Sequence, residues 1–197
     1  MTRLVFATDI HLNFADKDAI KSFCDSVIAA NAYGLVVTGD ITEGPTVCKF
    51  LELLQAAVRI PMYVVMGNHD WYGSHVADVR RHLDHLCTYV NPNINYMRSQ
   101  VIKLNDNWSI VGVDGWADAK YGSPEKGRVG LADWDYIKDY ADVQARLSYG
   151  SRTQLADKYA AQEAQALNAT LAAAVRQSSH VLVLTHIPPF REAAWHQ

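Results

Sequence analysis

The sequence at residues 62–70, MYVVMGNHD, decides the fold, because a short apolar strand runs directly into a cluster of polar side chains. The same pattern occurs at residues 4–11 (LVFATDIH), 35–40 (LVVTGD) and 181–186 (VLVLTH). The ends of neighbouring parallel strands meet at one edge of a sheet, so we expect these polar groups to share one cleft. Carboxylate, carboxamide and imidazole ligands without thiolates suit hard or borderline divalent cations. The sequence therefore predicts a metal site built from strand ends.

Helical periodicity separates the first three strands, because apolar residues recur there every three or four positions. Pro45 suits the first turn of the second helix, and Ser74 is expected to cap the third. The alternation predicts right-handed βαβ units and a largely parallel sheet, and therefore an α/β fold. The expected segments are strands at 2–8, 34–39 and 61–66, and helices at 16–31, 46–58 and 74–86.

The second half of the chain has a different pattern. Residues 95–104 and 108–114 predict two strands of a hairpin joined by an Asn-Asp-Asn turn. Residues 115–150 are rich in Trp, Tyr, Asp and Gly, and we interpret them as loops and short helices inserted over the cleft. A long helix over 151–178 and a final strand over 180–185 are expected to follow.

Length and composition indicate one domain with a sizeable core, since 49% of the 197 residues are hydrophobic and 20% are charged. A net charge of −3 gives no excess of positive charge that would favour tight binding to the phosphates of duplex DNA. We find no apolar run of about 18 residues that would span a membrane, and no leader before the first strand. The three cysteines lack metal or redox spacing, so we expect a cytoplasmic protein in a reducing compartment.

The strand-end motifs occur in the order Asp-Ile-His (9–11), Gly-Asp (39–40), Gly-Asn-His-Asp (67–70) and a single histidine, His186. In this order they resemble the signature of the calcineurin-like metallophosphoesterases. The fifth block of that signature, Gly-His-x-His, is absent between His186 and Gln197. The resemblance implies a β-sandwich flanked by helices, in which the second sheet is incomplete.

The missing block has consequences for the domain. By this resemblance, we interpret residues 1–197 as a single calcineurin-like domain that is C-terminally truncated and carries an insertion at 115–150. Three explanations stay open: a fragment of a longer polypeptide, a naturally short form, and completion by another chain. His196 could replace one of the lost ligands. An incomplete second sheet should leave an exposed edge or an apolar face.

The resemblance also implies two divalent metal ions, with Mn, Fe or Zn as the expected elements. It assigns Asp9, His11 and Asp40 to the first ion. It assigns Asn68 and His186, together with Asp40, to the second ion. Asp40 is then the bridging ligand, which is a suitable role for a group with two oxygens.

By the same resemblance, His69 is a catalytic residue that stabilises the phosphoryl oxygens or protonates the leaving group. Asp70 would orient His69 through a carboxylate–imidazole hydrogen bond. Asn68 and His69 would also contact the substrate. Arg191 lies shortly after the last strand, where it could reach a phosphate group, although an arginine that faces solvent fits equally well.

The implied reaction is metal-dependent hydrolysis of phosphomonoesters or phosphodiesters by a hydroxide that bridges the two metal ions. A phosphoester substrate is expected, and no membrane partner. Two alternatives stay open: a fold that lost turnover and serves as a protein-interaction domain, and a nuclease of the same family. The pI of about 6.2 counts mildly against nucleic acid. A homo-oligomer or the missing C-terminal segment could complete the fold.

Overall fold

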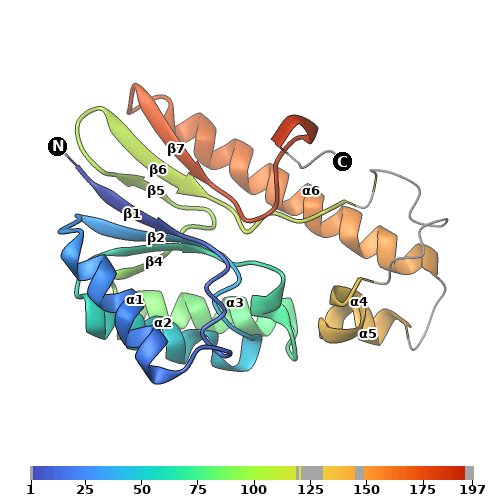
Figure 1. Ribbon diagram of the computed structural model, residues 1–197. Coiled ribbons are helices and arrows are strands. Elements are labelled where there is room, and N and C mark those ends of the chain that lie inside the picture. The colour runs from blue at the N-terminus through green and yellow to red at the C-terminus, as the bar shows by residue number, and fades with distance from the viewer. Residues whose placement is uncertain (1, 119, 121–130, 145–148, 194–197) are drawn as a thin grey trace.

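The computed structural model contains two β-sheets that face each other, with helices on both outer faces (Figure 1). Helices α1 (Lys17–Ala29), α2 (Val47–Val58) and α3 (Val76–His85) lie against the four-stranded sheet. The long helix α6 (Tyr149–Ala174) lies against the three-stranded sheet. The predicted α/β sandwich flanked by helices is therefore confirmed. The structure describes residues 2–118, 120, 131–144 and 149–193.

The four-stranded sheet is parallel throughout and has the strand order β1-β2-β3-β4. All residues of the two central strands are buried, as expected of parallel strands covered on both faces. Because the strands are parallel, the carboxyl ends of the first three emerge at one edge. The strands are β1 (Leu4–Ala7), β2 (Gly34–Thr38), β3 (Met62–Val65) and β4 (Ile94–Tyr96).

The three-stranded sheet contains β5 (Val101–Lys103), β6 (Trp108–Gly112) and β7 (His180–Leu184). The β5–β6 pair is antiparallel, which confirms the predicted hairpin, and the β6–β7 pair is parallel. The single strand predicted over 95–104 is wrong. The chain leaves one sheet at β4 and enters the other at β5, through a turn in which Ser99 has a φ of 64°. Both pieces contain β-branched or aromatic residues that favour strands, so sequence periodicity did not separate them.

Short helices complete the chain, and two of them lie within the segment expected as an insertion. These two helices, α4 and α5, confirm the short helices predicted for that segment. The boundaries of the insertion, 115–150, stay a prediction. The short elements are α4 (Asp133–Tyr136), α5 (Lys138–Gln144), three 3-10 helices (Gly44–Thr46, His69–Trp71 and Arg191–Ala193) and a π-helical turn (Leu86–Val90).

The start of α3 differs from the expectation. Ser74 was expected to cap this helix, but the N-cap position belongs to His75, which makes no capping hydrogen bond through its side chain. The N–H of Val76 donates instead to the carboxylate of Asp139 on α5, at 2.9 Å. The cap is therefore supplied by a residue that is distant in the sequence, and it ties α5 to α3.

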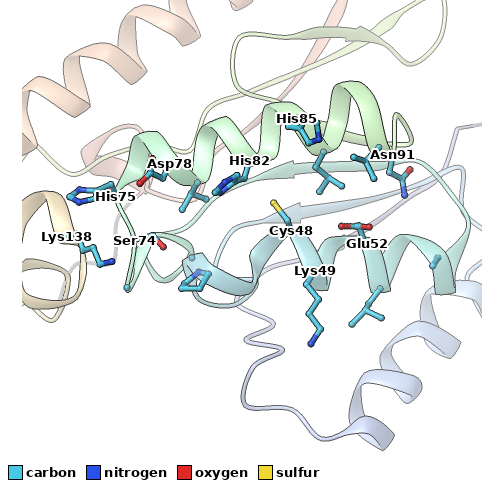
Figure 2. Close-up of a pocket in the computed structure, with 18 residues that line it drawn as sticks. Cys48, Lys49, Glu52, Ser74, His75, Asp78, His82, His85, Asn91 and Lys138 are labelled. Carbon is cyan, nitrogen blue, oxygen red and sulfur yellow. The ribbon is translucent and has the colours of Figure 1, made fainter.

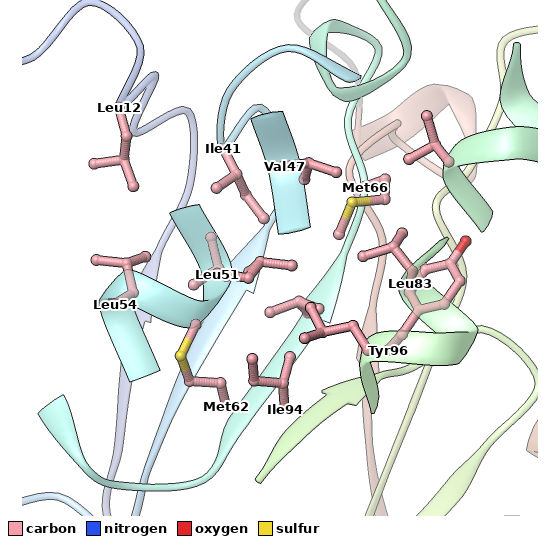
Figure 3. Close-up of a cluster of buried hydrophobic side chains, with 14 of the residues drawn as sticks. Leu12, Ile41, Val47, Leu51, Leu54, Met62, Met66, Leu83, Ile94 and Tyr96 are labelled. Carbon is pink, nitrogen blue, oxygen red and sulfur yellow. The ribbon is translucent and has the colours of Figure 1, made fainter. Parts of the chain in front are cut away.

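Apolar side chains fill two layers. The first layer lies between the parallel sheet and helices α1 to α3, and Figure 3 shows its centre, where Leu51, Leu83 and Met62 are fully buried. The second layer lies between the two sheets. Its buried members are Val36, Tyr63, Val65, Met97, Ile110 and Leu184.

Helix α6 turns the predicted side toward the rest of the molecule, but its most deeply buried positions are not the expected apolar ones. The apolar residues that were expected to form its inner face are only partly buried, and Val175, just beyond the helix, is 59% exposed. Small and polar side chains occupy the buried positions instead. The expected face was Leu155, Tyr159, Leu167, Leu171 and Val175, and the buried residues are Ala156, Glu163, Thr170 and Ala174.

The sandwich is open along its β1 edge. Strands β1 and β7 are the end strands of their sheets. Phe6 lies on the same face of β1 as Leu4, which packs against the layer between the sheets, yet Phe6 is 65% exposed. An exposed apolar side chain therefore lies at this edge of the sandwich. In the described part of the chain, no helix has the length and apolar character needed to cross a membrane.

Candidate metal centre

The loops that follow β1 and β2 run side by side. The N–H of Asp9 donates to the carbonyl of Gly39 at 3.1 Å, and the N–H of His11 donates to the carbonyl of Asp40 at 2.9 Å. Asp9, His11 and Asp40 have φ angles of 52°, 38° and 52°, in a region that residues other than glycine rarely adopt. Strained backbone of this kind clusters at ligand-binding sites and active sites.

Gly67, at the end of β3, allows the third loop to approach Asp40. A Cβ atom at this position would lie 2.1 Å from Oδ1 of Asp40 and 2.5 Å from its backbone nitrogen. The N–H of His69 donates to the same Oδ1 atom at 3.0 Å. Only glycine fits between the two loops, and this close contact fixes the orientation of the Asp40 carboxylate.

Asp40 lies at the centre of three imidazole rings and is 4% exposed. Its Oδ2 atom lies 3.8 Å from Nε2 of His11 and 3.9 Å from Nε2 of His69. Its Oδ1 atom lies 3.6 Å from Nε2 of His186. All three separations exceed the length of a hydrogen bond, so the ligand atoms converge without bonding to one another.

The imidazole of His186 is held in one tautomer. Its Nδ1 atom lies 2.8 Å from the carbonyl oxygen of Thr38, which can only accept, so Nδ1 carries the proton. The lone pair of the neutral ring is then on Nε2, 3.3 Å from Oδ1 of Asn68. A backbone carbonyl that fixes the ring in this way is typical of histidines that bind metal.

Divalent cations fit this arrangement. Two sets of ligand atoms lie within 4.8 Å of one another, namely His11, Asp40 and His69, and Asp9, Asp40 and His186. Asp40 belongs to both sets. In addition, Nδ1 of His11 is buried and has no hydrogen-bond partner among the described residues. Acceptor atoms that face one another are unfavourable unless a cation or a proton lies between them.

The two sets divide the residues differently from the resemblance. His69, expected outside the coordination sphere, groups with His11, and Asp9 groups with His186 rather than with His11. The predicted ligands Asp9, His11 and His186 nevertheless lie around Asp40, and Asn68 lies beside His186. The structure thus brings together residues from four strand ends, as the sequence pattern predicts.

Asp70 does not have the role expected of it. Its Oδ1 atom accepts hydrogen bonds from the N–H groups of Ile41 and Thr42, both at 2.9 Å, and its Oδ2 atom accepts from Gly67 at 2.8 Å. Among the described residues, these three backbone donors are the partners of Asp70 in place of the expected ring of His69. Burial raises the pKa of Asp70 to about 7, although the backbone donors oppose this shift. Asp70 ties the loop after β3 to the loop after β2.

The remaining predicted residues lie at the end of the chain. Arg191 begins the 3-10 helix Arg191–Ala193, and its contact with substrate stays a prediction. His196, considered as a replacement ligand, lies outside the described residues.

Sequence reasoning missed a polar group beside the metal ligands. The Nδ2 atom of Asn68 donates to Oδ1 of Asp133 at 2.7 Å and lies 3.3 Å from the hydroxyl oxygen of Tyr72. The Tyr72 hydroxyl donates to the same carboxylate oxygen at 2.6 Å. Asp133 comes from the irregular segment between the sheets and carries no motif, so no sequence signal pointed to it.

A buried ionic cluster behind the site was also missed. Asp114 follows β6 and is 0% exposed. Its Oδ1 atom accepts from the N–H of Met66 at 2.9 Å, and its Oδ2 atom accepts from Arg80 at 2.9 Å and from Tyr96 at 2.6 Å. Arg80 also bonds to Glu163 on α6 at 2.8 Å. The cluster links both sheets, α3 and α6 at the residue that precedes Gly67.

Two hollows lie near these elements. A recess of about 100 Å³ adjoins Asn68 and His186 and is lined mainly by aromatic and aliphatic side chains. A broader groove of about 1000 Å³ lies between α2 and α3 (Figure 2), and Asp40 does not line it. His82 and His85 line that groove, but among the described residues they do not belong to a group of three metal-ligating side chains. The candidate metal centre is therefore the group of residues at the strand ends, rather than this groove.

The fold and this site together define a metal-dependent phosphoesterase. A family model described as calcineurin-like phosphoesterase matches residues 2–197. The chain belongs to the calcineurin-like phosphoesterase family, and thus to the hydrolases that act on phosphoester bonds. A search of curated proteins found no match.

Solved structures show the same fold at low identity. A phosphopantetheinyl hydrolase from Mycobacterium tuberculosis has a TM-score of 0.62 and 16% identity, over 95% of this chain and 68% of that one. A dimetal phosphatase from Danio rerio has a TM-score of 0.52 and 15% identity, over 95% of this chain and 70% of that one. Both structures are longer than the present chain.

Proposed function

We propose that this protein hydrolyses phosphomonoesters or phosphodiesters at a dinuclear metal centre built around Asp40. The observation that carries the proposal is the buried Asp40 carboxylate, around which ligand atoms of Asp9, His11 and His186 lie within 4.8 Å. Mn, Fe or Zn are the expected elements, since nitrogen and oxygen donors without thiolates accept each of them. A phosphoester is the substrate class that the family implies.

The residues have distinct proposed roles. Asp9, His11, Asp40, Asn68 and His186 would hold the cations. When bound, such a pair of cations activates water as the hydroxide nucleophile and neutralises charge on the phosphate oxygens. The protein itself would contribute in two ways. It holds these side chains in position, and it places a proton donor near the leaving group.

His69 is the proposed proton donor. Its ring packs against the ring of Tyr72, with centroids 4.3 Å apart, and against the ring of His11 at 4.8 Å. These neighbours hold the imidazole beside Asp40 without occupying its Nε2 atom in a short hydrogen bond. We propose that His69 contacts the phosphoryl group and protonates the leaving oxygen. Arg191 is a second proposed contact to the phosphate.

The test is metal content together with Mn²⁺-dependent hydrolysis of p-nitrophenyl phosphate and of its bis ester. We expect about two metal ions per chain. In Asp40→Asn we expect hydrolysis to be lost and metal content to fall, because one shared carboxylate serves both ligand sets. The relative rates on the two substrates assign the preference for monoesters or diesters.

Lys21→Ala is a suitable control, since Lys21 is exposed and forms a surface ion pair with Asp25 on α1. It should bind metal and turn over substrate as the unmodified protein does. Absence of both metal and turnover in the unmodified chain would contradict the proposal and favour a protein-interaction domain.

A further inference from the structure

We infer that Asp133 is a positioning residue that turns the carboxamide oxygen of Asn68 toward the proposed metal site. The inference rests on the proposed function, because the orientation of Asn68 matters most if its oxygen is a ligand. Asp133 lies outside the strand-end motifs and approaches Asn68 from helix α4, 65 residues further along the chain.

The hydrogen bonds of Asn68 permit one orientation of its amide. The carboxylate of Asp133 can only accept, so the group of Asn68 that lies 2.7 Å from it must be the NH₂ group. A flipped amide would place the carbonyl oxygen of Asn68 against a carboxylate oxygen at that distance. Such a contact between two acceptors is strongly unfavourable in a half-buried site.

Tyr72 reinforces this orientation. A carboxylate oxygen can only accept, so the Tyr72 hydroxyl donates its proton to Asp133 at 2.6 Å. A lone pair on the phenol oxygen then faces the NH₂ group of Asn68 at 3.3 Å. Both hydrogens of the Asn68 amide therefore have acceptors on the same side.

The opposite side of Asn68 faces the site. Its Oδ1 atom lies 3.3 Å from Nε2 of His186, the atom that carries the lone pair of that ring. The two acceptors thus converge on the region beside Asp40, which lies 3.6 Å from the same Nε2 atom. Without Asp133, the amide could rotate and present its NH₂ group to a cation.

Helix α4 is anchored to the loop that carries Asn68, so Asp133 is held in place. The N–H of Gly73 donates to the carbonyl of Tyr136 at 2.9 Å, and the N–H of Lys138 donates to the carbonyl of Ser74 at 3.1 Å. The rings of Tyr72 and Tyr136 stack with centroids 5.3 Å apart. These contacts make the carboxylate a fixed acceptor rather than a mobile surface group.

The test is Mn²⁺ binding measured by equilibrium dialysis on Asp133→Ala, Asn68→Ala and Asp135→Ala. Removing the partner that orients a metal ligand typically weakens metal affinity by about 10–100-fold. We expect that loss for one of the two ions in Asp133→Ala and a similar loss in Asn68→Ala. Asp135 lies on the same helix with a side chain that is 70% exposed, so its substitution should leave both affinities unchanged.

The outcomes separate this inference from the proposed function. Weaker binding in Asn68→Ala with unchanged binding in Asp133→Ala would overturn the inference and leave the metal centre intact. Unchanged binding in both Asn68→Ala and Asp40→Asn would overturn the proposed centre itself. Thermal unfolding of each variant distinguishes lost positioning from a lost fold.

If Asp133→Ala does not fold, the inference can still be tested by exchanging the carboxylate and the carboxamide between positions 68 and 133. Asn68→Asp places two carboxylates against each other where the present contact is 2.7 Å, and adding Asp133→Asn restores a donor and an acceptor. We expect the double variant to bind Mn²⁺ about 10-fold or more tightly than Asn68→Asp alone. Equal affinity of the two would overturn the inference, because a merely structural aspartate would not show this coupling.

Discussion

Two fully buried carboxylates, Asp70 and Asp114, accept hydrogen bonds from adjacent residues at the end of β3, but they come from very different distances along the chain. Asp70 accepts from the N–H of Gly67, three residues earlier in the chain. Asp114 accepts from the N–H of Met66, which is 48 residues away. The first contact lies within one motif, whereas the second depends on the meeting of two sheets.

The partners of the two carboxylates differ in kind as well. In the described part of the chain, the hydrogen bonds of Asp70 all come from neutral backbone N–H groups, while Asp114 faces the guanidinium of Arg80 and the hydroxyl of Tyr96. Loss of a neutral hydrogen bond leaves a dipole unsatisfied, whereas loss of an ionic partner leaves a charge unpaired in the interior. The Asp114 cluster should therefore contribute more to global stability, and Asp70 more to the geometry of the metal site.

Asp114→Ala should have the largest effect on stability. It leaves Arg80, whose side chain is only 14% exposed, with Glu163 as its remaining carboxylate. Removing one partner of a buried ion pair costs about 3–5 kcal/mol. We expect the free energy of unfolding, measured by urea denaturation, to fall by that amount.

Asp78→Ala is the matched control for this prediction. It removes a carboxylate that pairs with Arg81 on the exposed face of α3. Exposed pairs of this kind contribute about 0–1 kcal/mol. Equal losses in Asp78→Ala and Asp114→Ala would show that the buried cluster is no stronger than a surface pair, and would break the comparison.

Asp70→Asn should have a smaller effect on stability and a marked effect on metal binding. The amide keeps one acceptor but places an NH₂ group against one of the backbone donors, either that of Gly67 or those of Ile41 and Thr42. One unsatisfied buried group costs about 1–3 kcal/mol. We expect a loss of that size in urea denaturation, with weaker Mn²⁺ binding in equilibrium dialysis.

Metal binding in Asp70→Asn that equals that of the unmodified protein would contradict the role assigned to Asp70. In that case the close contact at Gly67 and the hydrogen bond from the N–H of His69 would be enough to hold Asp40 in place. Asp114→Ala provides the counterpart, because any loss of metal affinity there should follow the loss of stability rather than exceed it.

The contrast between the two carboxylates explains what the sequence could predict. The strand ends and their ligands are local patterns, since an apolar run followed within a few residues by Asp9, Asp40 or Asn68 is visible without the fold. The hairpin of β5 and β6 is local too. These features were predicted, and the structure brings them together at one edge.

The contacts that support the site were not predicted, because each joins segments that are distant in the sequence. Asp133 meets Asn68 across 65 residues, and Arg80 meets Glu163 across 83. Helix α6 shows the same difficulty, since its apolar periodicity predicted a face that the structure leaves partly exposed. Glu163 lies on the buried face there because two arginines satisfy it, a fact that hydrophobic periodicity does not contain.

Arg98→Ala should have the smallest effect and would sharpen the comparison within the cluster itself. Arg98 donates to Glu163 through Nε at 3.0 Å, but its side chain is 27% exposed and Glu163 keeps its bond to Arg80 at 2.8 Å. Solvent screens a partly exposed charge, so we expect a loss of about 1 kcal/mol or less in the free energy of unfolding. A loss as large as that of Asp114→Ala would mean that Arg98, rather than Arg80, neutralises the buried glutamate. A small loss would mean that the Asp114–Arg80 pair contributes most of the cluster's share of the free energy of unfolding. That pair joins the two sheets and α3 beside Met66, the residue before Gly67.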